Sequence, residues 1–496
     1  MRSFTVSAFT SLIIALIILT SFSIRSHAES ASFVRSRFEL IDINGEKVPV
    51  QGDVVYPDFV PQPQSRKYVN LSDEWQILYD KEGSNIIVNG IRISLAERTP
   101  EVISILTNDM HRKLNANGWL RISAPSSNNA RNTPYSGYQG VTWYRRVFNL
   151  SKDDIEGKNV FIVFHGVNYI ADVWINKEYA GFHEGGFTPF VLNITRLVKA
   201  GRNEVVVRVD NIPWDSDDAI YAPIVPYKKC DWWNYGGIYR DVYIEIVNRT
   251  YIARVDVTPY RESNWFWSAK VRVVTVSDRS VNAELNICIY RASFTEEALT
   301  EWSVYKAIDF NSKIACSARI LNLRPGMNIA VEAFNNLNVE EWSPEHPHLY
   351  IVLAQLTIDG TVADSYADQF GFREVKVEEN RVLLNGAPVF LKGVARHEDY
   401  PVLGRALRPE MIFLDLLLVK DIGANFLRTA HYPNHPLTYI YADRLGILIW
   451  EEIPVYWFDR CWVFEKALAR GNSPANVSRD DLQRLQQTFD NHLGVG

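Results

Sequence analysis

The chain has 496 residues, which is enough for two to four domains. Hydrophobic residues make up 47% and charged residues 22% of the sequence, a balance typical of globular rather than disordered proteins. The formal net charge is −6 and no long basic run occurs, so nucleic acid is not an expected partner. No group of residues has the spacing of metal ligands, and we expect neither a metal nor another cofactor.

The N-terminus has the layout of a secretory signal peptide. Met1-Arg2 precedes an apolar run from Leu12 to Leu19, and Ser26-His-Ala28 offers a small-residue cleavage site. A membrane anchor needs about 20 unbroken apolar residues, whereas polar and charged residues interrupt this run between Ser21 and Arg25. We therefore predict cleavage after residues 1–28, a secreted or periplasmic protein, and no membrane partner once the signal is removed.

Four cysteines, Cys230, Cys288, Cys316 and Cys461, are too few and too scattered for a disulfide framework. Cys288 and Cys316 fall in one β-rich region, where both a bridge and two free thiols are open alternatives. Residues 29–67 are mixed in character and contain three prolines between Pro57 and Pro63, which predicts a lead-in rather than a core element.

Residues 68–250 have an all-β pattern. Short β-branched and aromatic runs occur at Val160–Phe164, Ala171–Ile175 and Glu204–Val209, separated by Gly or Asn. Asn176-Lys177 is predicted to form a hairpin turn between two strands. Many short strands with regular turns predict a jelly-roll sandwich, whose core accounts for much of the aromatic content. Exposed aromatic rings would instead suit the stacking of sugars.

Residues 251–370 form a second β-region. Val271–Val276 and Ala283–Ile289 alternate as half-buried strands do, and a proline-broken corner at Trp342–Tyr350 precedes a further strand. The size of about 120 residues predicts an immunoglobulin-like sandwich.

From residue 371 to 496 the period changes to that of a parallel α/β fold. Buried strands are expected at Pro388–Val394, Ala424–Thr429 and Gly446–Trp450. A helix is expected between each pair of successive strands, the first beginning at Pro409 and the second at Pro436. Each strand ends in polar residues, which follow here: Arg396-His-Glu-Asp399, His431-Tyr-Pro-Asn-His435 and Glu451-Glu452. In a (β/α)₈ barrel the carboxyl ends of the strands form the active-site face, so these residues predict a functional cleft.

Several long motifs in this chain resemble glycoside hydrolase family two, the family of β-galactosidases, β-glucuronidases and β-mannosidases. The resemblance runs from about Tyr68 to Trp457 and implies three parts: a jelly-roll sugar-binding domain, an immunoglobulin-like sandwich and an incomplete (β/α)₈ TIM barrel. It rests on Gly140–Arg146 and Asp231–Asp241 upstream, and on Lys392–Pro401, Arg428–Pro436 and Ala442–Ile453 in the barrel region.

The resemblance implies roles for individual residues. Asp231 matches an aspartate of the sugar subsite, and His397 and His431 match histidines that contact the substrate. Arg428 matches an arginine that holds carboxylates in place, although a structural ion pair is an alternative. Glu451-Glu452 stands where relatives carry Asp-Glu, so we interpret Glu452 as a supporting residue and not as a catalytic one.

Retaining glycosidases need an acid/base and a nucleophilic carboxyl group about 5–5.5 Å apart. The resemblance places the acid/base in an Asn-Glu pair after the fourth barrel strand and the nucleophile after the seventh. The Asn-Glu pair of this sequence, Asn203-Glu204, lies in a predicted jelly-roll strand. A barrel typically takes about 250 residues, more than remain after Phe370, so we expect a C-terminally truncated chain without either catalytic glutamate.

Two functions follow. The first is a retaining β-glycoside hydrolase chain, inactive as given, whose carbohydrate substrate is a β-galactoside or a β-glucuronide. His397-Glu-Asp399 with Gly404-Arg405 favours glucuronidases, whereas Asn434-His-Pro436 favours galactosidases. The alternative is a secreted, non-catalytic carbohydrate-binding protein. Homo-oligomers are compatible with both.

Overall fold

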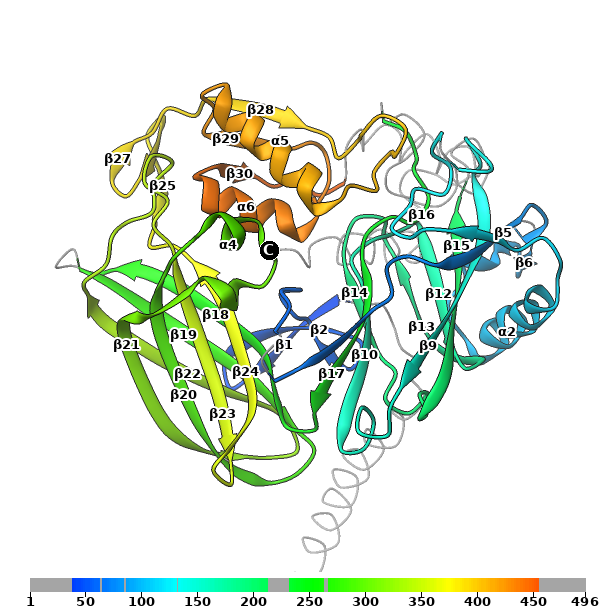
Figure 1. Cartoon of the computed structure of the whole chain (residues 1–496), viewed down its shortest axis with the longest axis horizontal. Coiled ribbons are helices and arrows are strands. Elements are labelled where there is room, and N and C mark those ends of the chain that lie inside the picture. The colour runs from blue at the N-terminus through cyan, green and yellow to red at the C-terminus, as the bar shows by residue number, and fades with distance from the viewer. Residues whose placement is uncertain are drawn as a thin grey trace, which may run out of the picture.

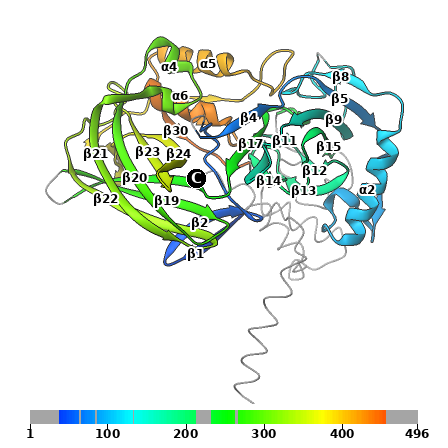
Figure 2. The ribbon, with the colours of Figure 1, turned by 60° about the horizontal axis from the view of Figure 1, so that its bottom comes forward.

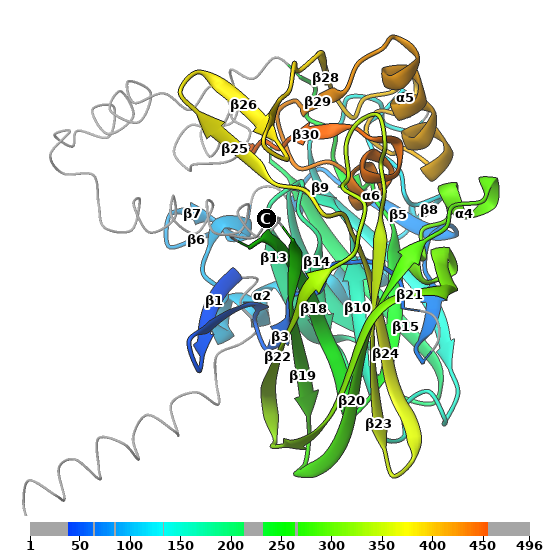
Figure 3. The same ribbon diagram turned by 90° about the vertical axis from the view of Figure 1, so that its left-hand side faces the viewer.

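The protein is described here from a computed structural model, which covers residues 38–62, 65–83, 86–131, 133–212, 232–262 and 266–454. Two β-sandwiches lie side by side, and an α/β unit sits across one end of both (Figures 1 and 3). The signal-peptide prediction, Asp231, and the cysteines Cys230 and Cys461 fall outside the described residues.

The first sandwich is the jelly roll that the strand pattern predicted. A six-stranded sheet in the order β13-β12-β15-β9-β5-β8 faces a four-stranded sheet in the order β14-β10-β17-β4. Its hairpin turn is confirmed, because Asn176 and Lys177 have φ values of 51° and 73° between β12 and β13. The strands are β4 (Lys67–Asn70), β5 (Trp75–Asp80), β8 (Leu120–Ile122), β9 (Gly140–Leu150), β10 (Lys158–Phe164), β12 (Ile170–Ile175), β13 (Glu178–Glu184), β14 (Phe190–Asn193), β15 (Gly201–Asn211) and β17 (Val242–Asn248), with the short pairs β6 (Ile87–Val88) and β7 (Ile91–Arg92), and β11 (Val167–Asn168) and β16 (Gly237–Ile238).

The jelly roll also contains a helix, so the prediction of an all-β domain is wrong at this point. Helix α2 (Pro100–Leu114) follows a one-turn 3₁₀ helix (Ile93–Leu95) and lies at the outer side of the domain (Figure 2). Thr99 caps α2 by accepting the Val102 N–H, and Pro100 occupies the first turn, a start signal that is visible in the sequence. Its apolar side packs on the outer face of the six-stranded sheet, against Trp143 and Trp174.

The lead-in is part of a core, so the prediction that residues 29–67 contain no core element is wrong. Strands β1 (Phe38–Ile43), β2 (Glu46–Gln51) and β3 (Val54–Val55) form an antiparallel sheet. Val48 and Val50 of this sheet are buried against apolar side chains of both sandwiches, including Val163 and Val274. The segment therefore fills the seam between two domains, and its prolines lie after the strands rather than within them, Pro49 excepted.

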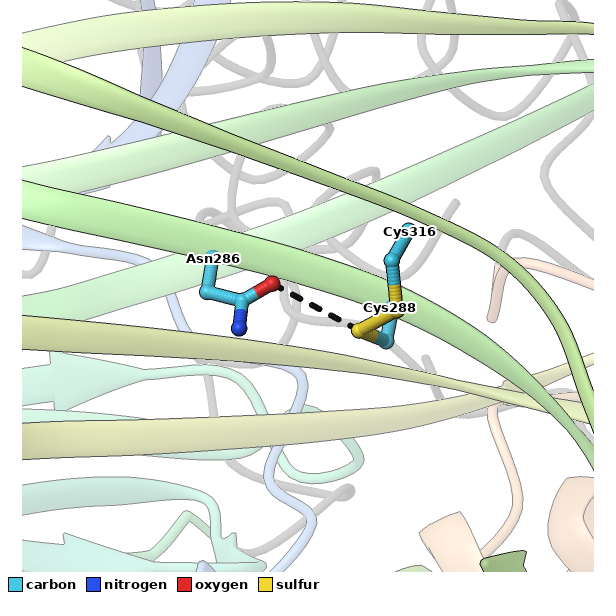
Figure 4. The surroundings of a disulfide bond; sticks show 3 residues. All are labelled: Asn286, Cys288 and Cys316. Atoms are coloured by element: carbon cyan, nitrogen blue, oxygen red, sulfur yellow. Dashed lines mark hydrogen bonds between the residues drawn. A yellow bond between two sulfur atoms is a disulfide. The ribbon is translucent and has the colours of Figure 1, made fainter. Parts of the chain in front are cut away.

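The second sandwich has the predicted immunoglobulin-like layering. Its sheets have the orders β18-β19-β22 and β21-β20-β23-β24. Cys288 and Cys316 are direct cross-strand neighbours and form a disulfide (Figure 4), which resolves the alternative that the sequence left open. A loop of 28 residues closed in this way stabilises the fold by about 3–4 kcal/mol in the chain-entropy account. The elements are β18 (Tyr251–Arg261), β19 (Trp267–Ser277), β20 (Val281–Ala292), β21 (Ile308–Leu323), β22 (Gly326–Leu337), β23 (Tyr350–Ile358) and β24 (Thr361–Phe370), with α4 (Glu296–Thr300) and a 3₁₀ turn (Val304–Ala307) between β20 and β21.

The last unit has the predicted strand–helix–strand–helix–strand order. Strands β28 (Gly393–Arg396), β29 (Phe426–Thr429) and β30 (Leu448–Trp450) are parallel, and α5 (Pro409–Asp421) and α6 (Pro436–Leu445) connect them. Both helices begin at the proline that the sequence indicated. Within the described residues, no helix is long and apolar enough to cross a membrane.

The first strand of this unit differs from its prediction. The apolar run Pro388–Val394 is divided between two sheets. Ala387–Pro388 forms β27, which pairs with β26 (Arg381–Leu384), and β26 in turn pairs with β25 (Val375–Glu378); β28 starts only at Gly393. None of the residues of β28 is buried, and the side chain of Phe390 is 80% exposed. An apolar run therefore predicted a buried strand where the chain instead crosses between two small sheets.

Candidate functional site

The loops that follow the three parallel strands meet at one edge of the sheet. Carboxyl ends of neighbouring parallel strands lie together, and the ring centroids of His397 and His431 are indeed 5.2 Å apart in an edge-to-face arrangement. Glu452 follows β30 and contacts His431 across the same edge. The described residues thus place polar side chains from all three strand ends at one edge of the sheet.

Arg428, His431 and Glu452 form a triangle at this edge. The Arg428 Nε donates to Glu452 Oε1 at 2.7 Å, and its Nη2 lies 2.9 Å from His431 Nδ1. The same Nδ1 lies 3.0 Å from Glu452 Oε2. One ring nitrogen can satisfy only one of these partners, so the proton position on His431 decides whether it accepts from arginine or donates to glutamate. Arg428 and Glu452 support His431 in both cases.

Glu451, the other member of the glutamate pair, is held apart from this triangle. Its carboxylate accepts hydrogen bonds from the hydroxyls of Tyr439, at 2.5 Å, and Thr429, at 3.3 Å. Thr429 also accepts the backbone N–H of Glu452. These contacts bind the end of β30 to β29 and α6, which fits the predicted role of the pair as scaffold.

The jelly roll contributes an aromatic residue that sequence reasoning missed. Trp232 stacks on the imidazole of His431 at 5.4 Å and 29°, and lies 6.1 Å from His397. It packs in a small cluster with Phe187 and Tyr432, and 8% of its surface is exposed. The signal was present, because Trp232 directly follows Asp231 in the motif that pointed to the sugar subsite. Trp232 thus joins the jelly roll to the two barrel loops that carry the histidines.

Three family models match successive parts of the chain. The sugar-binding domain of glycosyl hydrolases family 2 matches residues 68–247, the central family 2 domain matches 250–373, and the family 2 TIM barrel domain matches 375–494. The chain belongs to glycosyl hydrolase family 2. The barrel match continues beyond Trp457, where the resemblance by motifs had ended.

Relatives within family 2 include both expected enzyme types. The chain is 32% identical to a β-glucuronidase of Bacteroides fragilis over 64% of its own length and 43% of the relative's. It is 29% identical to a β-galactosidase of Thermoanaerobacter pseudethanolicus over 72% of its length and 46% of the relative's. The chain thus spans less than half of the length of these curated relatives.

A solved structure supports the fold. The β-glucuronidase of Ruminococcus gnavus in complex with D-glucuronic acid superposes with a TM-score of 0.64, at 20% identity, over 89% of this chain and 72% of that one. This likeness shows the arrangement of domains in a family 2 chain.

One group of side chains has the composition of a metal site. His165, Asp241 and His435 place potential ligand atoms within 4.8 Å of one another. However, His435 Nδ1 accepts the Leu437 N–H at the start of α6, so its proton is on Nε2, which donates to Asp241 at 3.2 Å. Burial lowers the pKa of His165 to about 3, which keeps that ring neutral. A neutral ring can still ligate a metal, but the proton on His435 Nε2 occupies the position of a ligand lone pair. In this family 2 chain the group is therefore a hydrogen-bonded contact between jelly roll and barrel.

A cavity of about 520 Å³ lies away from the histidines, between the lead-in, the second sandwich and α6. Neither Trp232 nor His397 nor His431 lines it. Three carboxyl groups do: Asp58, Asp368 and Asp443, the last of which forms an ion pair with Arg373. Burial raises the pKa of Asp58 to about 6, and it raises the pKa of Asp368 well above its usual range, with repulsion from Asp58 adding to the effect.

Asp58 and Asp368 predict a loss of stability as the pH rises. An unfolded aspartate titrates at about 3.9, so between about pH 4 and 6 Asp58 and Asp368 hold more protons in the folded chain, and their contribution to the free energy of unfolding falls as the pH rises. Asp58→Asn keeps the oxygen that accepts the Val60 N–H and should flatten this decline. The shift of the denaturant midpoint between about pH 4 and about pH 7, at either side of the window, measures this decline in both chains. Asp42→Asn is the control, and an equal flattening there contradicts the assignment.

Proposed function

We propose that this chain forms the sugar-binding face of a secreted retaining β-glycoside hydrolase that acts on terminal β-galactosides or β-glucuronides. The observation that carries the proposal is the stack of Trp232, from the jelly roll, on His431, from the barrel. His397 lies beside this stack, and Arg428 and Glu452 both contact the Nδ1 of His431. Asp231 precedes Trp232 in the chain and is proposed to accept hydrogen bonds from sugar hydroxyls.

We further propose that these 496 residues do not hydrolyse glycosides by themselves. Retention requires two carboxyl groups about 5–5.5 Å apart, which act as acid/base and as nucleophile. Glu452 is engaged by Arg428, and Glu451 is engaged by two hydroxyls. Glu204 lies in β15 of the jelly roll, as the sequence indicated, and offers no alternative. The resemblance assigns both catalytic glutamates to later barrel strands.

Export of the protein is also proposed, because residues 1–28 have the layout of a signal peptide. The disulfide between Cys288 and Cys316 supports this, since such bonds persist in oxidising compartments. Mass spectrometry of the protein secreted by its host should show an N-terminus near Glu29.

The expected result is binding without turnover. Nitrophenyl β-galactoside and β-glucuronide should not be hydrolysed above the buffer rate, while galactose or glucuronate should bind in a calorimetric titration. Trp232→Ala should weaken this binding by about tenfold, which corresponds to about 1.4 kcal/mol. Trp119→Ala is the control, because Trp119 stacks on Arg145 next to β8, the edge strand of the six-stranded sheet.

Two outcomes would contradict the proposal. Turnover that disappears in Glu452→Gln would make Glu452 catalytic. Sugar binding that is equally weakened by Trp119→Ala, or not weakened by Trp232→Ala, would place the sugar elsewhere. The better of the two sugars in competition then identifies which glycoside the site prefers.

A further inference from the structure

Two consecutive residues of the jelly roll, Arg240 and Asp241, reach into the barrel loops. They lie between β16 and β17, at the end of the upstream motif Asp231–Asp241, and the proposed function assigns no role to these two residues. The Arg240 guanidinium donates to Glu398 Oε2 and to the Pro433 carbonyl, both at 2.7 Å. Asp241 accepts from His435 at 3.2 Å. A cation and an anion next to each other thus bind two different loops.

These loops are the ones that hold the two site histidines. Glu398 directly follows His397, and Pro433 is two residues after His431. The loops are also bound to each other, because Glu398 Oε1 accepts the His435 N–H at 2.6 Å and the Glu398 N–H donates to the Tyr432 hydroxyl at 3.1 Å. The position of each histidine therefore depends on contacts that converge on the carboxylate of Glu398 and on its partner Arg240.

Arg240 also fixes the aromatic side of the site from within the jelly roll. Its Nη1 donates to the carbonyl of Phe187 at 2.7 Å. Phe187 stacks on Tyr432 at 4.4 Å, and Trp232 packs in the same cluster. One guanidinium consequently contacts the jelly-roll residue and both barrel loops that enclose the stack of Trp232 on His431.

Adhesion between domains is the simpler explanation of such a buried ion pair, and a second arginine of this chain illustrates it. Arg66 donates to Glu245 and Asp364, each at 2.8 Å, and so bridges the jelly roll and the second sandwich. Its side chain is 4% exposed, compared with 2% for Arg240. Neither of these two partners of Arg66 belongs to the barrel loops. A buried ion pair alone is weak evidence of stabilisation, so the choice of partners is what distinguishes Arg240.

We infer that Arg240 and Asp241 are positioning residues, which hold the loops of His397 and His431 in the geometry that the sugar meets. The inference rests on the proposed function, since it names the residues that order the same site. This positioning role requires no contact between Arg240 and the sugar.

The test compares Arg240→Lys with Arg66→Lys, which both keep the charge but cannot form the same set of hydrogen bonds. Imidazole signals of His397 and His431, assigned through His397→Gln and His431→Gln, are recorded by NMR of labelled histidine. We expect Arg240→Lys to shift both signals and to weaken sugar binding by about tenfold or more, because small misplacements of site residues are costly. Arg66→Lys should lower the melting temperature and leave both signals and the affinity unchanged.

Unchanged histidine signals in a folded Arg240→Lys variant would overturn the inference, and so would equal shifts in Arg66→Lys. If Arg240→Lys does not fold, Asp241→Asn decides by the same two measurements, because it alters the contact with His435 and leaves the hydrogen bonds of Arg240 in place. If the unmodified chain binds no sugar, the proposed function fails, while the NMR comparison still decides whether Arg240 positions the histidines.

Discussion

Replacing Arg98 by Met is expected to lower the free energy of unfolding of the jelly roll by about 3 kcal/mol. Arg98 forms two parallel hydrogen bonds with Asp172, at 2.7 and 3.0 Å, and neither side chain is more than 3% exposed. The substitution leaves the carboxylate buried without its closest cation. Arg208 remains 3.9 Å from Asp172, which places the expected loss at the low end of the range for a broken buried pair.

A control variant distinguishes the cost of leaving a buried charge unpaired from the cost of losing an exposed ion pair. Lys152→Met removes an ion pair with Glu156 in which the two side chains are 73% and 63% exposed, and should cost less than about 1 kcal/mol. Hydrogen exchange of the amides in β12 and β15 measures both effects within the jelly roll, since a chain of several domains does not unfold in one step. A loss for Arg98→Met no larger than that of the control would show that Asp172 is neutral or solvated.

This network also shows which parts of the fold a sequence can reveal. Strand positions such as Val160–Phe164 were predictable, because alternation and β-branched residues report on a pleated, half-buried surface. The packing of α2 and the segment before it on the outer face of the six-stranded sheet was not predictable. It depends on charged partners such as Arg98 and Asp172, which are 74 residues apart, and no periodicity records such a pairing.

Local patterns were misleading where domains meet. Val48 and Val50 occur among prolines and charged residues, and only the two sandwiches on either side make their segment a core. The apolar run before Gly393 looked like a single buried strand, but its first residues pair with β26, as the Val389 N–H to Val382 carbonyl hydrogen bond shows, and the chain then changes sheets.

The candidate site was predictable in its barrel half. His397, His431 and Glu452 follow strands whose order was readable, and parallel strands place such residues together. The contribution of the jelly roll was harder to predict, because Trp232 and Arg240 lie far along the chain from the loops that they contact, as the Arg240–Glu398 separation of 158 residues shows. The motif Asp231–Asp241 contains both residues, but its sequence does not indicate what they contact.

The strongest test of how the barrel unit is docked is Gly446→Ala. Gly446 ends α6 with φ +71°, and a Cβ there would lie 2.4 Å from the carbonyl oxygen of Pro344 in the second sandwich. The end of α6 is fixed to the same corner by Trp342, whose Nε1 donates to the Asp443 carbonyl at 2.8 Å. The backbone cannot move away from Pro344 without breaking this contact.

We expect Gly446→Ala to destabilise the barrel unit by about 2–5 kcal/mol, the sum of a left-handed backbone and a steric clash. Gly423→Ala is the matched control, since Gly423 follows α5 with φ +77° and has nothing within 4 Å of its Cβ position, so only the backbone cost of about 1–2 kcal/mol applies. Limited proteolysis should then cut residues 393–454 faster in Gly446→Ala than in Gly423→Ala, while β19–β24 resist in both. Equal cleavage rates in the two variants would mean that the corner at Pro344 does not hold the barrel unit in place.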